Sequence, residues 1–527
     1  MIFGGGRGEE LEKGKRSAIK YIVNAILQGE QSVETLKRKA AKKFGLSEAV
    51  RNSDILANIP KSMRTDAIVR LLEKRPMRTL SGVTPIAVMI KPEGSCRHSC
   101  IYCPAAGTGP KSYTGYEPAA LRARQAAFDP YEQVRLRLKH YIETGHPTDK
   151  CELIIMGGTF LQTPKRYKHC FIKALYDSLN KRKSNTLEQA KKRNEMAKHR
   201  AVGLTIETRP DVCESKEIDE MLSYGATRVE LGVQHPDNAI YRLIKRGHAV
   251  ADVIDATKRL KDSAFKVCYH LMPGLPGSNP KKDIVILKKL FSDERFRPDM
   301  LKIYPALVMP GTGLHAMMKQ GKYTPYSSEK AAEVISEFYR HIPKYARVMR
   351  IQRDIPSGLI AEGAKKSNLR ELVEQRVMKK NIKAWEIRTR EIGLLGEEFV
   401  KSEFDITRLE YEASGGKEIF LSFENKKGLL AGFLRMRLPD NTVHRKEINK
   451  KTALVRELHV YGKEALIRAN GAVQHRGIGS GLLIEAEKIA KEEFEKNNII
   501  IISGVGTREY YRKKGYKLTG PYMAKAI

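Results

Sequence analysis

Short apolar runs alternate with amphipathic stretches through the middle of the chain, from about residue 83 to residue 360. The runs have the length of buried strands, and the stretches between them place apolar residues at helical spacing. This alternation predicts a parallel sheet, closed or partly closed into a barrel. The expected strands are Val83–Ile90, Leu153–Met156, Val202–Ile206, Arg228–Val233, Phe265–Leu271, Leu301–Tyr304 and Arg347–Ile351. The expected helices include Ala119–Glu143, Glu217–Tyr224, Lys281–Phe291 and Ser328–His341.

The two ends of the chain show other patterns. Helical spacing with many basic residues predicts helices at Ala18–Leu27 and Val33–Phe44, and the basic stretch 181–200 predicts an exposed helical insertion. Near the C-terminus we expect strands at Leu430–Leu438, Leu454–Tyr461 and Ile499–Ser503 and a helix at Ser480–Phe494. The expected division is a basic helical segment (1–82), a barrel (83–360), a basic linker (361–390) and a mixed α/β domain (391–527).

The chain carries a large excess of positive charge. It has 96 Lys and Arg against 61 Asp and Glu, a formal net charge of +35. Such a surface attracts polyanions, and nucleic acid is the expected partner. The alternative is a charged surface adapted to a salty or hot cell. In that case the numbers of acidic and basic residues should both be high. No apolar run reaches the length of a membrane span, and the N-terminus lacks the apolar stretch of a secretory signal, so we expect a cytoplasmic protein without a membrane partner.

Three of the seven cysteines lie close together, at Cys96, Cys100 and Cys103, directly after a predicted strand. The other four are single, which fits a reducing compartment and one metal site rather than a disulfide framework. Three thiolates can hold three irons of a [4Fe–4S] cluster and leave the fourth iron open for another ligand. The alternative is a zinc site with His98 as the fourth ligand.

The spacing Cys96-x3-Cys100-x2-Cys103, with the aromatic Tyr102, resembles that of the radical S-adenosylmethionine (SAM) enzymes. The resemblance implies a [4Fe–4S] cluster and a SAM site built from residues at the carboxyl ends of the strands. Any one of the residues at these strand ends, taken alone, would more often belong to the core or to a turn. Gly157 and Gly158 could hold the amino group of SAM, and Glu207 its ribose. The full set of expected SAM contacts is Tyr102, Gly157, Gly158, Thr159, Glu207, Gln234 and His270.

A second glycine-rich motif, Gln474-x-Arg476-Gly477-x-Gly479, precedes the predicted C-terminal helix and resembles the GNAT acetyltransferases. Free N–H groups at such a helix start can bind the pyrophosphate of coenzyme A. Tyr510 and Tyr511 are the candidate catalytic residues, which could contact the thioester or protonate the leaving thiolate, with core packing as the alternative. The expected acetyl-CoA contacts are Glu457, Leu458, His459, Val460, Gln474, Arg476, Gly477, Ile478, Gly479, Ser480 and Tyr511.

A radical SAM barrel joined to a GNAT domain resembles the family of the Elongator catalytic subunit, a tRNA uridine acetyltransferase. Strings such as Ser112–Pro118, Ile206–Asp211 and Gly520–Met523 support this. The resemblance implies an α/β multidomain protein that uses SAM-derived radical chemistry on acetyl-CoA to place a carboxymethyl group at C5 of the wobble uridine. It implies the tRNA anticodon stem-loop as partner, and a homodimer or Elongator-like accessory subunits besides. Because no cysteine follows Cys268, we expect no cysteine-based zinc site between the domains.

Two other functions compete with this reading. One is a protein-lysine acetyltransferase whose barrel is only structural, and the other is a tRNA-binding assembly scaffold. The intact cysteines and the intact turn at Gly477 and Gly479 count against both, because neither function needs the two cofactor motifs together.

Overall fold

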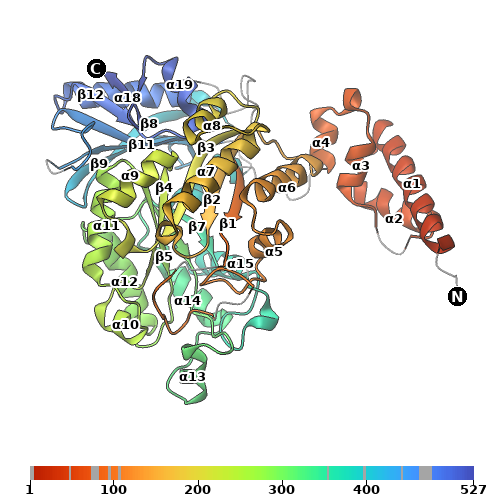
Figure 1. The fold of residues 1–527 in the computed structure, drawn as a ribbon, viewed down its shortest axis with the longest axis horizontal. Coiled ribbons are helices and arrows are strands. Elements are labelled where there is room, and N and C mark those ends of the chain that lie inside the picture. The colour runs from red at the N-terminus through yellow and green to blue at the C-terminus, as the bar shows by residue number, and fades with distance from the viewer. Residues whose placement is uncertain are drawn as a thin grey trace. The chain divides into compact units, whose positions relative to one another are not determined.

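The computed structural model describes residues 5–46, 49–72, 82–92, 96–104, 108–352, 355–395, 399–440, 443–461 and 477–527. The chain divides into two compact units. The first comprises Met1–Leu80 together with Arg135–Thr148, and the second comprises Ser81–Val134 together with Asp149–Ile527. Figure 1 shows the first unit in red and orange and the second in orange to blue.

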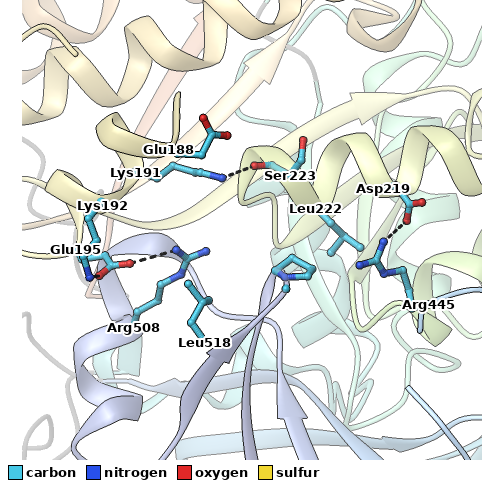
Figure 2. A pocket seen from close by; sticks show the side chains of 12 residues that line it. Glu188, Lys191, Lys192, Glu195, Asp219, Leu222, Ser223, Arg445, Arg508 and Leu518 are labelled. Carbon is cyan, nitrogen blue, oxygen red and sulfur yellow. Dashed lines mark hydrogen bonds and ion pairs between the residues drawn. The ribbon is translucent and has the colours of Figure 1, made fainter. Parts of the chain in front are cut away.

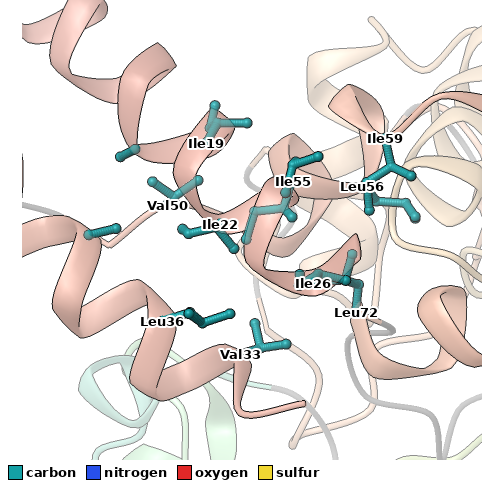
Figure 3. Close-up of a cluster of buried hydrophobic side chains, with 13 residues drawn as sticks. Ile19, Ile22, Ile26, Val33, Leu36, Val50, Ile55, Leu56, Ile59 and Leu72 are labelled. Atoms are coloured by element: carbon teal, nitrogen blue, oxygen red, sulfur yellow. The ribbon is translucent and has the colours of Figure 1, made fainter. Parts of the chain in front are cut away.

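The first unit is a small helical bundle with its own apolar core. Apolar residues three or four positions apart on α1 face those of the next helices, as Figure 3 shows for Ile19, Ile22 and Ile26. The basic residues between them, among them Lys13, Lys20 and Lys39, are exposed. The helices expected at Ala18–Leu27 and Val33–Phe44 are therefore confirmed. The elements are α1 (Gly5–Leu27), α2 (Val33–Lys43), α3 (Asn52–Asn58), η1 (Lys61–Met63), α4 (Asp66–Leu72) and the end of α6 (Pro130–Glu143).

The second unit begins with a seven-stranded, all-parallel sheet in the order β1-β2-β3-β4-β5-β6-β7. Its first and last strands do not pair, so the sheet is a half-barrel, and all seven expected strands are confirmed within a few residues. Figure 1 shows helices over its outer face. The strands are β1 (Thr84–Met89), β2 (Lys150–Met156), β3 (Arg200–Thr208), β4 (Arg228–Gln234), β5 (Lys266–Leu271), β6 (Met300–Ile303) and β7 (Arg347–Ile351).

Helices connect successive strands of the half-barrel. They are α5 (Pro118–Gln125), α6, α7 (Lys165–Asn180), α8 (Leu187–Asn194), α9 (Ser215–Tyr224), α10 (Asn238–Leu243), α11 (Val250–Asp262), α12 (Pro280–Ser292), α13 (Gly313–Lys319) and α14 (Ser328–Phe338). After the last strand, α15 (Leu369–Lys379) packs against α14 and is followed by α16 (Ile387–Arg390) and α17 (Ile392–Leu395). Short 3-10 turns lie at η3 (Phe160–Gln162), η4 (Pro210–Val212) and η5 (Ser357–Leu359).

Two helix predictions for this region are wrong in part. The single helix expected at Ala119–Glu143 is two, because Ala127 and Phe128 adopt left-handed backbone angles and Pro130 starts a new helix. The insertion expected to be exposed at 181–200 contains α8, which buries Leu187 and Ala190. In the part of the chain that is described, no helix combines the length and apolar character needed to cross a membrane.

A second sheet of seven strands follows, in the order β13-β14-β12-β11-β10-β9-β8. Only β11 and β12 run parallel, and the other neighbours are antiparallel. Helix α18 packs on β9, β10 and β11. The three strands and the helix expected here are confirmed, but β8, β9, β13 and β14 were not predicted. The elements are η6 (Lys401–Glu403), β8 (Phe404–Ala413), β9 (Gly416–Asn425), β10 (Leu430–Leu438), β11 (Thr452–Val460), α18 (Ile478–Glu492), β12 (Asn498–Ile501), η7 (Val505–Thr507), α19 (Arg508–Arg512), β13 (Lys517–Thr519) and β14 (Tyr522–Ala526).

Buried arginines join this second sheet to the half-barrel. Arg456 on β11 donates to both carboxylate oxygens of Asp299, which precedes β6, at 2.6 and 2.8 Å, and to Glu418 on β9. Arg437 on β10 donates to Asp262 at the end of α11 at 2.6 Å. Asp299 and Asp262 both lie at the amino-terminal edge of the barrel strands. The second sheet therefore packs on the edge opposite the strand ends that carry the expected radical site.

Candidate functional site

The loop carrying the three cysteines is held in place by backbone hydrogen bonds on both sides. The N–H of Ile101 donates to the carbonyl of Ile244 at 3.1 Å, and the N–H of Leu314 donates to the carbonyl of Ile101 at 2.8 Å. Cys100 is buried and the other two cysteines are half-buried, and none of the three forms a disulfide. The strand order places this loop, which follows β1, at the carboxyl-terminal edge of the half-barrel.

Cations surround the cysteine loop. Arg246 lies 3.6 Å from the sulfur of Cys100 and also donates to the carbonyl of Gly232 on β4. The ammonium of Lys111 donates to the carbonyls of Cys96, at 3.2 Å, and of His98. Three cysteines on one loop, with cations beside them, fit the ligand set of an iron–sulfur cluster with an open iron.

The zinc alternative is not favoured by the position of His98. Its Nε2 lies 3.3 Å from Asp211, which is also bound by Arg209. Burial and the nearby Arg209 lower the pKa of His98. The imidazole is thus engaged with Asp211 rather than left free as a fourth metal ligand.

Two glycines shape the end of β2 beside the cysteine loop. Gly157 and Gly158 have φ angles of +132° and +80°, and a Cβ on Gly157 would lie 2.4 Å from the side chain of Ile90. Only glycine fits there without strain. Thr159 follows, buried, and its hydroxyl has no hydrogen-bond partner among the described residues. Backbone groups and one free hydroxyl are therefore available to a polar ligand at this strand end.

The other expected SAM contacts lie at the ends of β3, β4 and β5. Glu207 accepts a hydrogen bond from the hydroxyl of Tyr113 at 2.8 Å. Gln234 has a φ angle of +66°, and its carbonyl accepts from the N–H of Met272. A non-glycine residue in this conformation is uncommon and typical of functional sites. Tyr102, on the cysteine loop itself, is half-buried, and burial raises its pKa.

Ionisable side chains cross the concave face of the half-barrel. Lys302 on β6 contacts Glu230 on β4 and lies 3.9 Å from Glu207 on β3, and His270 on β5 lies 2.8 Å from Glu230. A side chain can reach a strand three places away only across the inside of a curved sheet. Burial alone would raise the pKa of Glu230, but Lys302 and His270 hold it well below its usual range. The carboxylate is therefore ionised.

The second sheet opens where a GNAT domain would take its acyl donor. Pairing of β11 with β12 covers Thr452–Val455 only, although β11 continues to Val460. The end of β11 beyond its pairing with β12, which pairs with β10 on its other side, contains four of the expected acetyl-CoA contacts, Glu457–Val460. Glu457 is engaged by Arg435 at 2.8 Å, whereas the next three residues are half-buried. The two strands β11 and β12 thus separate beyond Val455, at the place where the expected acetyl-CoA contacts lie.

The start of α18 lies beside the same opening. Gly477 precedes the helix with a φ angle of +84°, and Gln474 and Arg476 lie outside the described residues. A Cβ on Gly479 would lie 3.2 Å from the hydroxyl of Tyr510, which bonds to Ser480. Tyr510 is 38% exposed, whereas Tyr511 is buried between Tyr510 and Tyr516. The structure brings Tyr510, with Gly479, Ser480 and β11, to one place, and turns Tyr511 into the core.

A cavity of about 560 Å³ lies between α8, α9 and the segment from Arg508 to Pro521 (Figure 2). Its charges pair with one another: Glu195 with Arg508, and Asp219 with Arg445 at 2.5 Å. Lys191 donates to the carbonyl of Ser223 at 2.6 Å. Helices α8 and α9 precede the starts of β3 and β4, so this cavity belongs to the seam between the barrel and the second sheet.

Sequence reasoning missed the charged interior. Arg246, Glu230 and Lys302 were not among the expected site residues. The signal was available in Arg228–Gln234, where polar residues and glycine alternate with apolar ones. Such alternation indicates a strand with one polar face, here the face toward the barrel interior.

Comparison with known proteins agrees with this geometry. Family models match the radical SAM superfamily at residues 90–290, the radical SAM C-terminal domain at 298–379 and the ELP3 N-terminal domain at 15–80. The chain is 48% identical to a tRNA uridine(34) acetyltransferase of Methanocaldococcus infernus, over 97% of this chain and 100% of that protein. It is 40% identical to the human Elongator complex protein 3, over 97% of this chain and 96% of that protein.

A solved structure is also similar. It is the archaeal Methanocaldococcus infernus Elp3 with an N-terminus deletion (1-46), 49% identical, with a TM-score of 0.77 over 85% of this chain and all of that one. The similarity to named proteins thus extends over almost the whole sequence, including the cysteine loop and the second sheet. The chain therefore belongs to the radical SAM family formed by the tRNA uridine(34) acetyltransferases and Elongator complex protein 3.

Proposed function

We propose that this protein modifies the wobble uridine of tRNA, using SAM-dependent radical chemistry on acetyl-CoA to place a carboxymethyl group at C5. One observation carries the proposal. A three-cysteine loop at the carboxyl edge of a half-barrel and an opened strand pair beside a glycine turn lie in one compact unit. A single reaction that uses both sites accounts for their presence in the same unit. The curated relatives named as tRNA uridine(34) acetyltransferases support the choice of substrate.

The proposed roles follow from position. Cys96, Cys100 and Cys103 would hold the [4Fe–4S] cluster, which when bound supplies the electron that cleaves SAM to a carbon radical. Gly157–Thr159 would bind the amino group of SAM, and Glu207, fixed by Tyr113, its ribose. Cys100, Gly157 and Thr159 are buried, which limits the access of water to a reactive radical. A methyl C–H bond offers no acidic proton to an ordinary base, so a radical route suits this chemistry.

At the second sheet, the pantetheine arm of acetyl-CoA would lie along the end of β11, beyond Val455, where β11 and β12 separate. The first N–H groups of α18 would bind its pyrophosphate. Tyr510 would be the tyrosine that contacts the thioester; its hydroxyl bonds to Ser480 and lies 3.2 Å from the Cβ position of Gly479, which supports this choice over the buried Tyr511.

The exposed basic helices of the first unit suit the phosphate backbone of tRNA. We accordingly assign tRNA binding to residues 1–82, radical chemistry to 83–360 and acetyl-CoA binding to 391–527, with 361–390 as the connection. We propose the cytoplasm as the place of the reaction. The homodimer or accessory subunits that the resemblance implies stay predictions.

The test uses anaerobically reconstituted protein with reductant, SAM, tRNA and trideuterated acetyl-CoA. We expect one deuterium in 5′-deoxyadenosine and two in a carboxymethyl group on the wobble uridine, measured by mass spectrometry. Unlabelled 5′-deoxyadenosine, or acetylated lysine peptides without modified uridine, would refute the proposal. A Cys100→Ala variant is the control for chemistry that does not need the cluster.

A further inference from the structure

His270 stands on the concave face of the half-barrel, at the carboxyl end of β5. Its side chain is 14% exposed, and its Nε2 lies 2.8 Å from the fully buried Glu230. The ring also packs edge-on against Tyr304, with ring centroids 5.4 Å apart. Lys302 links this pair to the expected ribose contact, because it contacts Glu230 and lies 3.9 Å from Glu207. His270 is therefore held close to where the radical would form.

The hydrogen bond to Glu230 fixes which nitrogen of His270 carries the proton. An ionised carboxylate can only accept, so Nε2 must be the donor. In the neutral ring, Nδ1 then keeps its lone pair. Within the described residues, Nδ1 of His270 has no hydrogen-bond partner among the side chains or the backbone. His270 thus donates to Glu230 through Nε2 and can accept a proton at Nδ1.

The neighbouring ionisable groups are less suited to accept a proton. Burial would lower the pKa of Lys302, but Glu230 raises it above its usual value, so the ammonium stays protonated. Glu207 already accepts from Tyr113. Burial raises the pKa of Tyr304, and Arg228, beside Glu230, is a cation. Oε1 of Glu230 lies 3.3 Å from Arg228 and accepts no hydrogen bond among the described residues, but the pKa of this carboxyl is held well below its usual range, which makes it a weak base. Nδ1 of His270 is therefore the nitrogen lone pair in this face that is left to accept a proton.

The proposed reaction needs such a group. When the carbon radical of the acetyl group bonds to C5 of uracil, the unpaired electron moves to C6 while C5 keeps its hydrogen. Restoring the C5=C6 double bond requires loss of that hydrogen as a proton, together with one electron. The electron must pass to a one-electron acceptor, for which an oxidised iron–sulfur cluster is the available class in a radical SAM enzyme. The proton needs a base within hydrogen-bond reach.

We propose that His270, oriented by Glu230 and Lys302, is the base that takes the C5 proton of the target uracil. This inference rests on the proposed function and adds a residue to it. The positioned side chain accelerates this step and leaves the earlier hydrogen abstraction from acetyl-CoA unaffected. General base catalysis of this kind contributes roughly 10²- to 10⁴-fold.

The experiment separates these two steps in the reconstituted full-length enzyme. The tRNA carries tritium at C5 of the wobble uridine, and tritium released to water reports loss of the C5 proton. Deuterium passing from trideuterated acetyl-CoA to 5′-deoxyadenosine reports hydrogen abstraction. The inference gives His270 the role of base in place of the SAM contact expected from the sequence. In His270→Gln we therefore expect tritium release to fall about 100-fold or more, with deuterium transfer and SAM affinity unchanged. His341→Gln, a half-buried histidine after α14, is the matched control and should match the parent in all readouts.

A second variant distinguishes loss of the base from a packing defect. In His270→Gly, added imidazole should restore tritium release, which a packing defect would not allow. Tritium release at the parental rate in His270→Gln, absence of imidazole rescue, or loss of SAM binding with the cluster intact would each overturn the assignment. If instead the parent enzyme transfers no deuterium from acetyl-CoA, the proposed function itself fails, which is a different result.

Discussion

Replacing Arg456 by Met should lower the free energy needed to separate the second sheet from the half-barrel. The decrease should be larger than for the loss of a positive charge at the surface. Arg456 is fully buried and donates to Asp299, to Glu418 and, at 2.8 Å, to the carbonyl of Phe265. Methionine fills similar space but leaves two buried carboxylates without their main cation. Removing one partner of a buried ion pair typically costs about 3–5 kcal/mol. At 1.36 kcal/mol per factor of ten, the ratio of open to closed forms should rise about 150- to 5,000-fold.

The effect should depend on pH in a defined direction. Burial would raise the pKa of Asp299, but Arg456 and Lys261 hold it far below its usual value. In the parent, the ionised carboxylate therefore contributes stability at any pH above about 3.9, which is lost only as acid approaches the depressed pKa. Without Arg456, burial favours the protonated acid. The deficit of the variant should be largest at neutral pH and should shrink as the pH falls.

The single tryptophan of the chain supplies the assay. The ammonium of Lys344, a residue that precedes β7, lies 4.9 Å from the centroid of the Trp385 ring. The edge of the same ring lies 3.3 Å from the position of a Cβ on Gly428, in the turn between β9 and β10. Its fluorescence should report separation of the two parts during urea titration. Arg408→Met is the control, because Arg408 pairs with Glu493 at the surface, where ion pairs contribute about 0–1 kcal/mol. If both variants lose the Trp385 signal at the same urea concentration, the buried network does not hold the domains together.

Three further outcomes are expected. The triple Ala variant at the three loop cysteines should lose the iron and sulfide, about four of each per chain, that the parent binds; iron retained in the variant would contradict the ligand assignment. Gly157→Ala places a methyl group against Ile90 and should weaken SAM binding while sparing tRNA affinity, measured by calorimetry, and parental SAM affinity would remove the strand-end site. Deleting residues 1–80 should weaken tRNA binding and flatten its salt dependence by roughly 0.7–0.9 log units per lost phosphate contact, and an unchanged slope would place the RNA surface elsewhere.

The sequence by itself was sufficient to locate the seven strands of the half-barrel and the cofactor motifs, but not four of the strands of the second sheet. Strands of a parallel half-barrel are buried runs separated by helices, so periodicity alone locates them, and β10 was placed to the residue. Cysteine spacing and the glycine turn are local signals as well. Where local signals conflicted, prediction failed: the break at Ala127 and Phe128 depends on two left-handed residues that helix propensity does not reveal.

Only the tertiary structure decided which distant side chains meet. Glu230, His270 and Lys302 come from three strands and converge because the sheet curves, and Arg456 finds Asp299 because the second sheet packs on one edge of the barrel. Tyr510 and Tyr511 are neighbours in sequence, yet one reaches the helix start and the other enters the core. Periodicity reports which face of its own element a residue occupies. What lies opposite that face is set by curvature and packing, which no local pattern encodes.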